Sequence, residues 1–312
     1  MDQPVAAPRP APLSALGDGH EEAVERGASV WRRTWDSLRH DKLALLGSAI
    51  VLLFVVVAVF APALAPHDPT TQFQDGLSPL GAPLAPNAKF VLGADDLGRD
   101  LLSRLIYGAR VSLTIGVLAN ALAVVIGVAI GAVSAYAGGI VGTVLMRLTD
   151  ITMAFPVLLF AIALIAITGP SLTNVVVVIA VLYWTTIARV VHGMVLSLKE
   201  REFVEAARAL GATGPRILLL YILPHLVSVI VVYTTLGIAT TVLVEASLSY
   251  VGISVPPPQA TWGNMINEAQ NYYHSDPWMM MFPGLAILVT VLGFNLLGDW
   301  LRDTLDPVRR SE

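Results

Sequence analysis

The sequence contains no cysteine and has little charge. The lack of cysteine in its 312 residues excludes disulfides, thiolate metal sites and cysteine nucleophiles. Charged residues make up 13% of the chain, against about 25% in a soluble protein, whereas hydrophobic residues make up 55%. With a formal net charge of −4 and no basic domain or stripe, we expect no nucleic-acid partner. This composition indicates a chain whose surface largely contacts the lipid bilayer.

The sequence also lacks the motifs of an energy source or an active site. It has no G-K-[ST] tripeptide and therefore no Walker A loop, and it has neither H-E-x-x-H nor G-x-S-x-G. Ion-coupled carriers usually bury ionisable groups near the middle of the membrane, and the apolar segments contain almost none. We therefore expect no catalytic residue, metal site or cofactor in this chain, and we predict that a separate subunit supplies its energy.

Six apolar segments are about long enough to cross the hydrocarbon core of a bilayer. They are Leu43–Ala65, Val111–Tyr136, Ile151–Thr168, Leu172–Ala188, Leu226–Val244 and Trp278–Leu297. In the second, Gly127 and Gly131 form a G-x-x-x-G pair, which permits close contact between helices. The predicted fold class is an all-α polytopic membrane protein with six transmembrane helices.

The distribution of basic residues predicts the orientation and the division of the chain. Residues 1–30 are rich in proline and alanine without an apolar run, which predicts a disordered cytoplasmic tail. An N-terminal segment with the first span (31–66), an extracytoplasmic loop (67–108) and a core domain with five spans (109–310) follow. Most basic residues fall before the first span, after the fourth and at the C-terminus, which places both termini in the cytoplasm. Four fall in the outer loop instead, where Asp95, Asp96 and Asp100 are close enough to offset them: Lys89, Arg99, Arg104 and Arg110.

The segment EAARALGATGPRILLLYILPHL (205–226) interrupts the spans with a distinctive pattern. Glu202–Leu210 is helix-prone, with carboxylates in the first turn, where they suit the positive end of a helix. Gly211 is placed to stop this helix, and Gly214–Pro215 to start another. The pattern predicts a short amphipathic helix, a sharp turn and a return into the bilayer. Such a segment either fits a groove on a soluble partner or only anchors the loop at the membrane surface.

At this segment the sequence resembles the permease subunits of bacterial ABC importers. Their cytoplasmic motif is E-A-A, three residues, glycine, nine residues and I-x-L-P, with Tyr221 here at the isoleucine position. The matching residues, which the resemblance assigns to ATPase coupling within loop 199–224, are Glu205, Ala206, Ala207, Gly211, Leu223 and Pro224. Without the resemblance, Glu205 is only a charge in the first turn of a helix.

Three further stretches, 91–113, 245–265 and 282–310, are similar to the C-type subunit of the dipeptide/oligopeptide/nickel branch. The resemblance implies a type I ABC importer transmembrane domain (MetI-like) in the bacterial plasma membrane, forming half of a pore for di- or oligopeptides. It also implies four partners: a homologous B-type permease subunit, two ATPase domains that bind ATP and magnesium, and an extracytoplasmic substrate-binding protein. The whole complex would be a peptide-transporting ATPase.

Some residue roles and functions stay open at this point. Glu245 and Ser249 are candidates for the pore or a gate, although Glu245 is equally well explained as an interfacial carboxylate. Arg99, Asp100, Arg104 and Trp262 are candidate contacts for a binding protein, although the charges can simply pair and the tryptophan can belong to an interfacial belt. A nickel importer shares the same motifs. A secondary carrier or channel would show inverted repeats, broken helices or charges in the middle of the membrane, none of which the sequence indicates.

Overall fold

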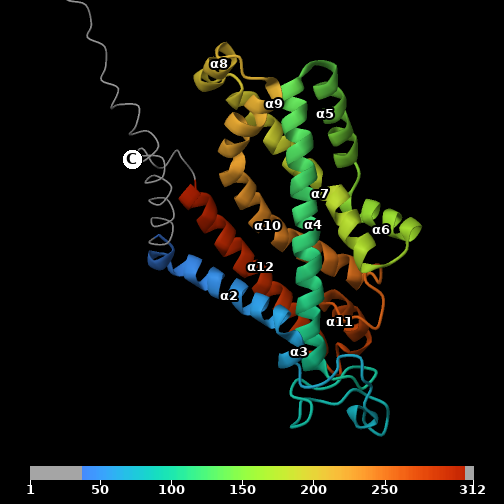
Figure 1. Cartoon of the computed structure of the whole chain (residues 1–312). Coiled ribbons are helices and arrows are strands. Elements are labelled where there is room, and N and C mark those ends of the chain that lie inside the picture. The colour runs from blue at the N-terminus through green and yellow to red at the C-terminus, as the bar shows by residue number, and fades with distance from the viewer. Residues whose placement is uncertain (1–36, 306–312) are drawn as a thin grey trace, which may run out of the picture.

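The computed structural model describes residues 37–305, which form a long helical bundle with α8 at one end and α11 at the other (Figure 1). Within this range the only β-pairing is two isolated bridges, and the predicted all-α class is confirmed. The long helices are α2 (Lys42–Val59), α4 (Leu101–Ala137), α5 (Gly139–Met153), α6 (Val157–Thr168), α7 (Leu172–Leu198), α10 (Leu223–Tyr250) and α12 (Trp278–Leu305). The short elements are α3 (Ala61–Leu64), η2 (Gln74–Gly76), α8 (Glu202–Ala209), α9 (Gly214–Ile217), η3 (Leu218–Ile222), α11 (Trp262–Glu268) and η4 (Ala269–Tyr272).

Five helical runs in the described range are long and apolar enough to cross a membrane. They are Lys42–Val59, Leu101–Ala137, Leu172–Leu198, Gly214–Tyr250 and Trp278–Leu305. Each contains most of one predicted span. With 37 residues, α4 extends over about 55 Å at 1.5 Å per residue, well beyond a hydrocarbon core of about 30 Å. This helix therefore reaches from one end of the bundle to the other.

The predicted third span, Ile151–Thr168, is wrong as a single helix. The chain forms α5 and α6 instead, and the two helices are bent by 92° relative to each other. The break lies at Phe155–Pro156, because proline has no N–H to donate and its ring disfavours a helical conformation of the preceding residue. Pro156 becomes the N-terminal cap of α6. The chain has the predicted six spans only if this bent pair counts as one.

Side-chain caps explain where four of the helices begin. Asp41 accepts hydrogen bonds from backbone N–H groups at the start of α2, and Asp100 accepts one from Ser103 at the start of α4. Ser171 and Thr261 cap α7 and α11 in the same way. Such caps satisfy N–H groups that have no partner within the helix. They fix the first turns of α4 and α11 at the same end of the bundle.

The most extensive helix contact in the described bundle joins α4 to α7, and the two glycines of the G-x-x-x-G pair lie in it. A Cβ atom added to Gly127 would lie 2.6 Å from the carbonyl oxygen of Trp184, and one added to Gly131 would lie 2.4 Å from that of Ala188. Only a residue without a side chain fits at such a distance. The predicted close contact is confirmed.

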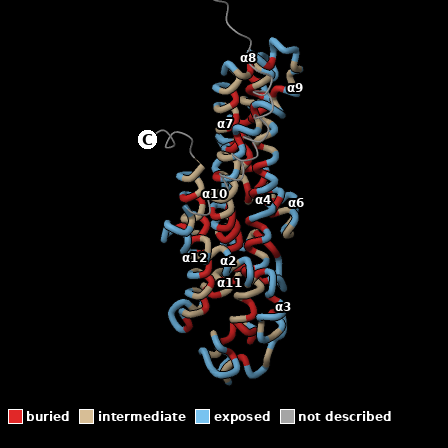
Figure 2. The backbone as a smooth tube through the Cα atoms, turned by 60° about the vertical axis from the view of Figure 1, so that its left-hand side comes forward, coloured by how far each residue is buried: buried red, intermediate tan, exposed pale blue. Residues whose placement is uncertain are grey.

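Buried apolar side chains form clusters at both ends of the bundle. At the α8 end, one cluster joins side chains of α4, α7, α8, α9, η3 and α10. At the α11 end, another joins α2, α4, α10, α11 and α12. Figure 2 shows buried positions along the middle of the bundle and exposed ones on its outside. Large apolar residues such as Leu53, Val125 and Leu288 are among the exposed ones, as expected for a surface that faces lipid or another subunit.

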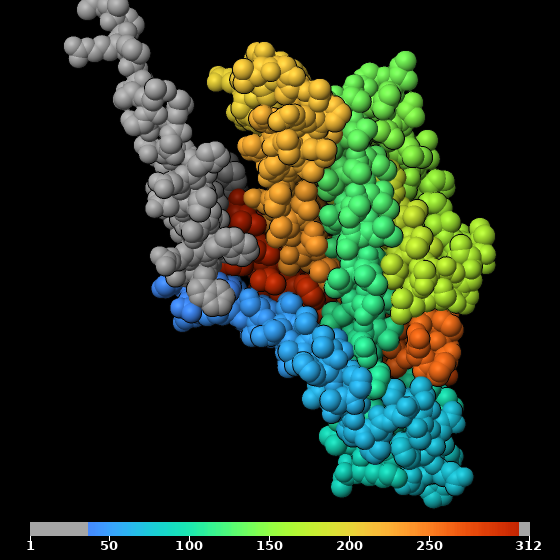
Figure 3. Space-filling model, in the orientation of Figure 1, coloured from blue at the N-terminus to red at the C-terminus, as the bar shows by residue number. Residues whose placement is uncertain are grey.

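The segment between α3 and α4 forms a lobe at the α11 end, seen as the blue-green knob at the bottom of Figure 3. The rings of His67, Phe73 and Phe90 pack together at its centre, with centroids 5.1 to 5.8 Å apart. The backbone N–H of His67 donates a hydrogen bond to Ser103 Oγ in α4 at 2.9 Å. The lobe is therefore an ordered part of this end.

Candidate functional site: the α8 loop and two buried polar clusters

Helix α8 has one face packed on the bundle and one face exposed. Val204 and Ala207 are buried, whereas Glu205 and Ala206 are exposed. Glu202 and Glu205 lie in the first turn and Arg208 in the last, which matches the polarity of the helix dipole. The predicted amphipathic helix is confirmed. The segment that contains it, residues 199–224, is called the α8 loop.

The turn after α8 depends on Gly211. Its φ of +83° lies in the left-handed region, which a residue without Cβ adopts at little cost. The Ala212 N–H donates to the Ala207 carbonyl at 3.0 Å and the Gly211 N–H donates to that of Arg208 at 2.9 Å. This pair of bonds is the Schellman motif, which satisfies the last carbonyls of a helix. The predicted glycine stop is confirmed.

The chain then re-enters the bundle without a break. Pro215 lies in the first turn of α9, as predicted, and η3 is a π-helical turn that leads directly into α10. Pro224, in the first turn of α10, has no N–H to donate to the preceding turn. The wider π turn before Pro224 lets the helix continue past the proline. Because α9, η3 and α10 form one continuous helical run, Gly214–Tyr250, the α8 loop leads directly into a span.

Contacts with two further spans hold the α8 loop. The Lys199 Nζ donates a hydrogen bond to the Ala135 carbonyl, near the end of α4, at 3.1 Å. Gly214 lies against the Tyr136 ring, where an added Cβ would be 3.1 Å from the ring edge. Val204 and Ala207 pack in the cluster that includes side chains of α4, α7 and α10. A displacement of α8 therefore acts on three spans.

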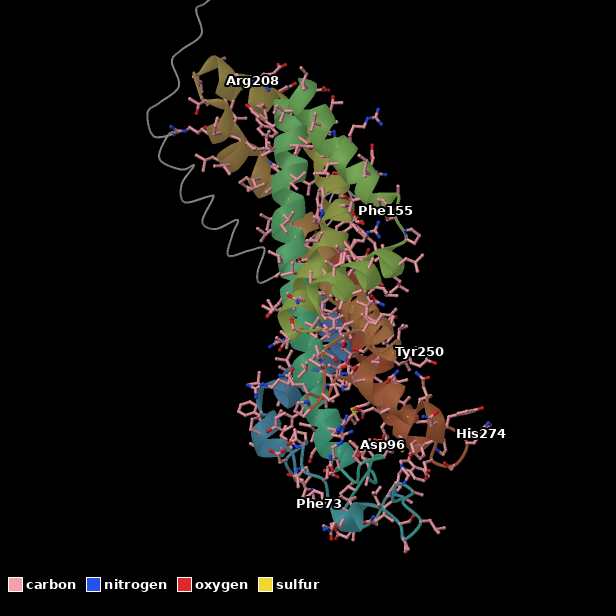
Figure 4. All side chains as sticks on the ribbon, turned by 90° about the vertical axis from the view of Figure 1, so that its right-hand side faces the viewer. Phe73, Asp96, Phe155, Arg208, Tyr250 and His274 are labelled. Atoms are coloured by element: carbon pink, nitrogen blue, oxygen red, sulfur yellow. The ribbon has the colours of Figure 1, made fainter. Side chains whose placement is uncertain are left out.

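The tip of the α8 loop exposes an apolar side chain among charges. Leu210 is 89% exposed, immediately before the glycine turn. Glu205, Arg208 and Arg216 are exposed around it, and Figure 4 shows Arg208 at this end of the molecule. A shallow pocket of about 290 Å³ lies beside the tip, lined by Leu210, Gly211, Thr213, Arg216 and Tyr221 among others. An apolar tip with a charged rim is suited to bind a socket on a soluble protein.

The first buried polar cluster surrounds Glu245, near the other end of α10. This carboxyl is 0% exposed. Its Oε1 accepts hydrogen bonds from Ser249 Oγ at 2.6 Å and Ser254 Oγ at 3.3 Å, and its Oε2 accepts one from Ser112 Oγ of α4 at 3.1 Å. Of the two residues predicted to serve in a pore or gate, Glu245 and Ser249, both are buried and bonded to each other. Their hydrogen bonds link α10 to Ser112 of α4, and a role of Glu245 and Ser249 in a pore or gate stays a prediction.

The second buried polar cluster joins the start of α4 to the end of α11. Arg99 Nε donates to Asp95 Oδ2 at 2.6 Å and its guanidinium reaches Glu268 Oε2 at 3.0 Å. Arg104 reaches the same Glu268 oxygen at 2.6 Å and Asp95 at 3.2 Å. Asp95 thus offsets basic residues of this loop, as predicted. Burial, and then the carboxylates of Asp95 and Glu268, raise the pKa of Asp96.

The four residues predicted to contact a binding protein, Arg99, Asp100, Arg104 and Trp262, are all buried. Asp100 does not pair with either arginine but caps α4 and lies 3.4 Å from His67 Nδ1. The indole Nε1 of Trp262 donates to the Leu105 carbonyl at 3.1 Å, and its ring packs on Gly108. A protein that docks at this end would touch the surface around these side chains, which themselves hold the end together.

Comparison with known proteins places the chain in a family. Residues 123–311 match the model of the binding-protein-dependent transport system inner membrane component, and residues 29–86 match that of the N-terminal TM domain of oligopeptide transport permease C. The first match alone covers more than half of the chain. The chain belongs to this family of transport permeases. As a permease it is a multi-pass membrane protein that works with other transporter subunits.

Curated relatives match the permease over nearly its whole length. The dipeptide transport system permease protein DppC of Alkalihalophilus pseudofirmus is 39% identical over 91% of this chain and 91% of its own. The di/tripeptide transport system permease protein DppC of Pseudomonas aeruginosa is 41% identical over 89% and 92%. The oligopeptide transport system permease protein OppC of Bacillus subtilis is 38% identical over 96% and 97%. The resemblance to the C-type branch is confirmed.

A solved structure supports the fold of the permease. A chain of the MetNI methionine ABC transporter, in an inward-facing conformation, superimposes with a TM-score of 0.54 at 20% identity. It covers 65% of the permease and 96% of that chain. The predicted type I ABC importer transmembrane fold is therefore confirmed.

One feature of the permease differs from the grounds on which the sequence set a carrier aside. The bend between α5 and α6 is a broken helix, which is a feature of secondary carriers. Glu245 is buried but lies near the end of α10 and not at its middle. The family match, and not a lack of carrier features, assigns the chain to the permeases.

Sequence reasoning missed the residues that complete the two polar clusters. Glu268 receives both arginines, and Ser112 and Thr261 complete the cluster at Glu245. One signal was present: the 251–277 loop contains the acids Glu268 and Asp276 but no basic residue, whereas the first outer loop contains arginines. Acids without a basic partner in their own loop favour pairing with arginines of the other loop.

Proposed function

We propose that the permease forms one half of the pore of an ABC importer for di- or oligopeptides. The names of its relatives support this substrate class, because the dipeptide, di/tripeptide and oligopeptide permeases above match the chain over nearly all of their length. The glutathione transport system permease protein GsiD of Escherichia coli O157:H7, 41% identical over 89% of the chain, is named for glutathione, which is a tripeptide. Peptide is therefore favoured over nickel.

The complete importer contains a homologous B-type permease subunit, two ATPase domains that bind ATP and magnesium, and an extracytoplasmic substrate-binding protein. The complex as a whole is a peptide-transporting ATPase, and this chain contributes no nucleotide site. It lies in the bacterial plasma membrane with both termini and the α8 loop in the cytoplasm. The basic residues at both termini and in the α8 loop support this orientation.

One observation supports the mechanism: the α8 loop has an exposed tip, packs against α4 and α7, and continues directly into α10. When ATP closes the two ATPase domains, the α8 loop moves with them. Because α10 continues from the loop without a break, this movement shifts the spans and opens the pore outward; hydrolysis resets it. ATP at one end and the loaded binding protein at the other then bias the same two-state element.

Purification of the permease with its partners tests the proposal. We expect two ATPase domains, a second permease and a binding protein to co-purify, and the reconstituted complex to take up a labelled dipeptide only with ATP and binding protein. Uptake of nickel in place of peptide would overturn the substrate class. Uptake by the permease alone, driven by an ion gradient, would overturn the assignment to an ATP-driven importer.

A further inference from the structure

Helix α11 lies across the outer end of the bundle, and Glu245 holds its first turn through two hydroxyl links. The Trp262 backbone N–H donates to Ser112 Oγ at 3.3 Å, and that hydroxyl donates to Glu245 at 3.1 Å. On the other side, the hydroxyls of Thr261 and Ser249 lie 3.2 Å apart, and Ser249 donates to Glu245 at 2.6 Å. One carboxyl thus connects α11 to α4 and to α10 at once.

Glu245 is an unusual choice for a purely structural contact. In the described part of the chain its hydrogen-bond donors are three serine hydroxyls, and no basic side chain forms an ion pair with it. A buried carboxyl without a cation is unfavourable compared with an amide of the same shape. An ionisable group retained at such a position within a membrane-spanning helix points to a function.

The other end of α11 is held independently. Glu268, the last residue of α11, receives Arg99 and Arg104, which lie directly before and within the first turn of α4. Between the two ends, Trp262 packs on Gly108 of α4. Helix α11 therefore has no free end about which to pivot, and its position follows that of α4 and α10.

We propose that Glu245 is a positioning residue that makes α11 and the outer ends of α4 and α10 move as one body during transport. The same two spans reach the α8 loop, α4 through Ala135 and Tyr136 and α10 through the continuous helix. A binding protein that docks on the α11 end therefore acts on the ATPases through Glu245. This inference rests on the proposed function, in which such a protein docks at that end.

A distance measurement in the assembled complex tests the positioning role without any transport. Because this chain contains no cysteine, Gln259→Cys, exposed just before the first turn of α11, and Leu118→Cys, exposed in α4, can be spin-labelled before the complex is assembled. We expect a narrow distance distribution that broadens in Glu245→Ala and in Ser112→Ala. Ser247→Ala is the matched control, since this half-buried hydroxyl donates to the Leu243 carbonyl of its own helix and lies outside the Glu245 cluster. Unchanged distributions in both cluster variants would overturn the proposal.

Coupling is the second readout, one that a merely stabilising contact would not alter. We measure ATP hydrolysis by the reconstituted complex with and without loaded binding protein. Coupling between two sites is typically about 5- to 150-fold. We therefore expect Glu245→Ala and Ser249→Ala to lower the ratio of ATP hydrolysis with and without loaded binding protein at least fivefold. Glu245→Gln, which keeps an acceptor for Ser249, should retain part of this stimulation. Wild-type stimulation in every variant would overturn the inference. An unstimulated wild-type complex would instead overturn the proposed function, and the distance measurement would still decide the role of Glu245.

Discussion

Replacing Gly211 with valine strains the turn of the α8 loop and nothing else. The residue has a φ of +83°, and an added Cβ would meet no atom within 4 Å, so the cost comes from the backbone conformation alone. A left-handed conformation costs a residue with Cβ roughly 1–2 kcal/mol, and a β-branched residue more. Because about 1.4 kcal/mol is a factor of ten in an equilibrium, the native turn loses about tenfold or more in relative population.

The assay compares peptide uptake with ATP hydrolysis in membrane vesicles that contain equal amounts of each complex. We expect Gly211→Val to insert normally and to lower the uptake per ATP hydrolysed. Gly211→Asn should lie closer to wild type, because asparagine tolerates the left-handed region. Gly193→Ala is the matched control: this glycine has equally open space but an ordinary helical conformation. Uptake by Gly211→Val equal to that of Gly193→Ala would refute the role of the turn.

Three further predictions test packing, docking and electrostatics. Gly131→Ala places a Cβ 2.4 Å from the Ala188 carbonyl oxygen, so we expect thermal unfolding in detergent to show a loss on the order of 1–3 kcal/mol; stability equal to Gly193→Ala would contradict the close contact. Leu210→Ser should weaken ATPase binding by more than about 1 kcal/mol, measured by titration, whereas Leu80→Ser, 96% exposed at the opposite end, should leave it unchanged; equal effects would exclude the tip as an anchor. Burial raises the pKa of Asp96 above its unfolded value of 3.8, so its ionisation destabilises the fold as the pH rises through the raised pKa. The unfolding temperature should therefore fall over this pH range, and Asp96→Asn should reduce the fall. A pH profile of the unfolding temperature equal to that of the wild type would contradict this prediction.

Local patterns were sufficient to predict the α8 loop. The glycine stop and the proline restart need only a few neighbouring residues, and the structure places them where the sequence indicates. The π turn η3 was not predicted, because the predicted span begins only at Leu226, whereas the helical run starts at Gly214 and includes this turn. The G-x-x-x-G pair also predicted a contact, although its partner, α7, was not specified.

The third span shows the limit of a hydropathy criterion. Apolar residues continue from α5 through α6, so their average conceals the bend that Phe155–Pro156 introduces. The polar clusters were out of reach for another reason. Arg104 and Glu268 lie 164 residues apart in sequence, and spacing alone contains no information on such a pair. Glu245 was found as a candidate together with Ser249, its neighbour one turn along the same helix, but Ser112 lies 133 residues away in sequence and only the fold brings it to the carboxyl.

The central claim is that the exposed tip of the α8 loop binds an ATPase subunit. The most direct test places a photo-crosslinking residue at position 210 of the intact complex, with the same residue at position 80 as the control on the opposite end. The account predicts that position 210 crosslinks to the ATPase and that position 80 does not. A complex that hydrolyses ATP and transports peptide, yet gives no ATPase crosslink at position 210, would contradict it.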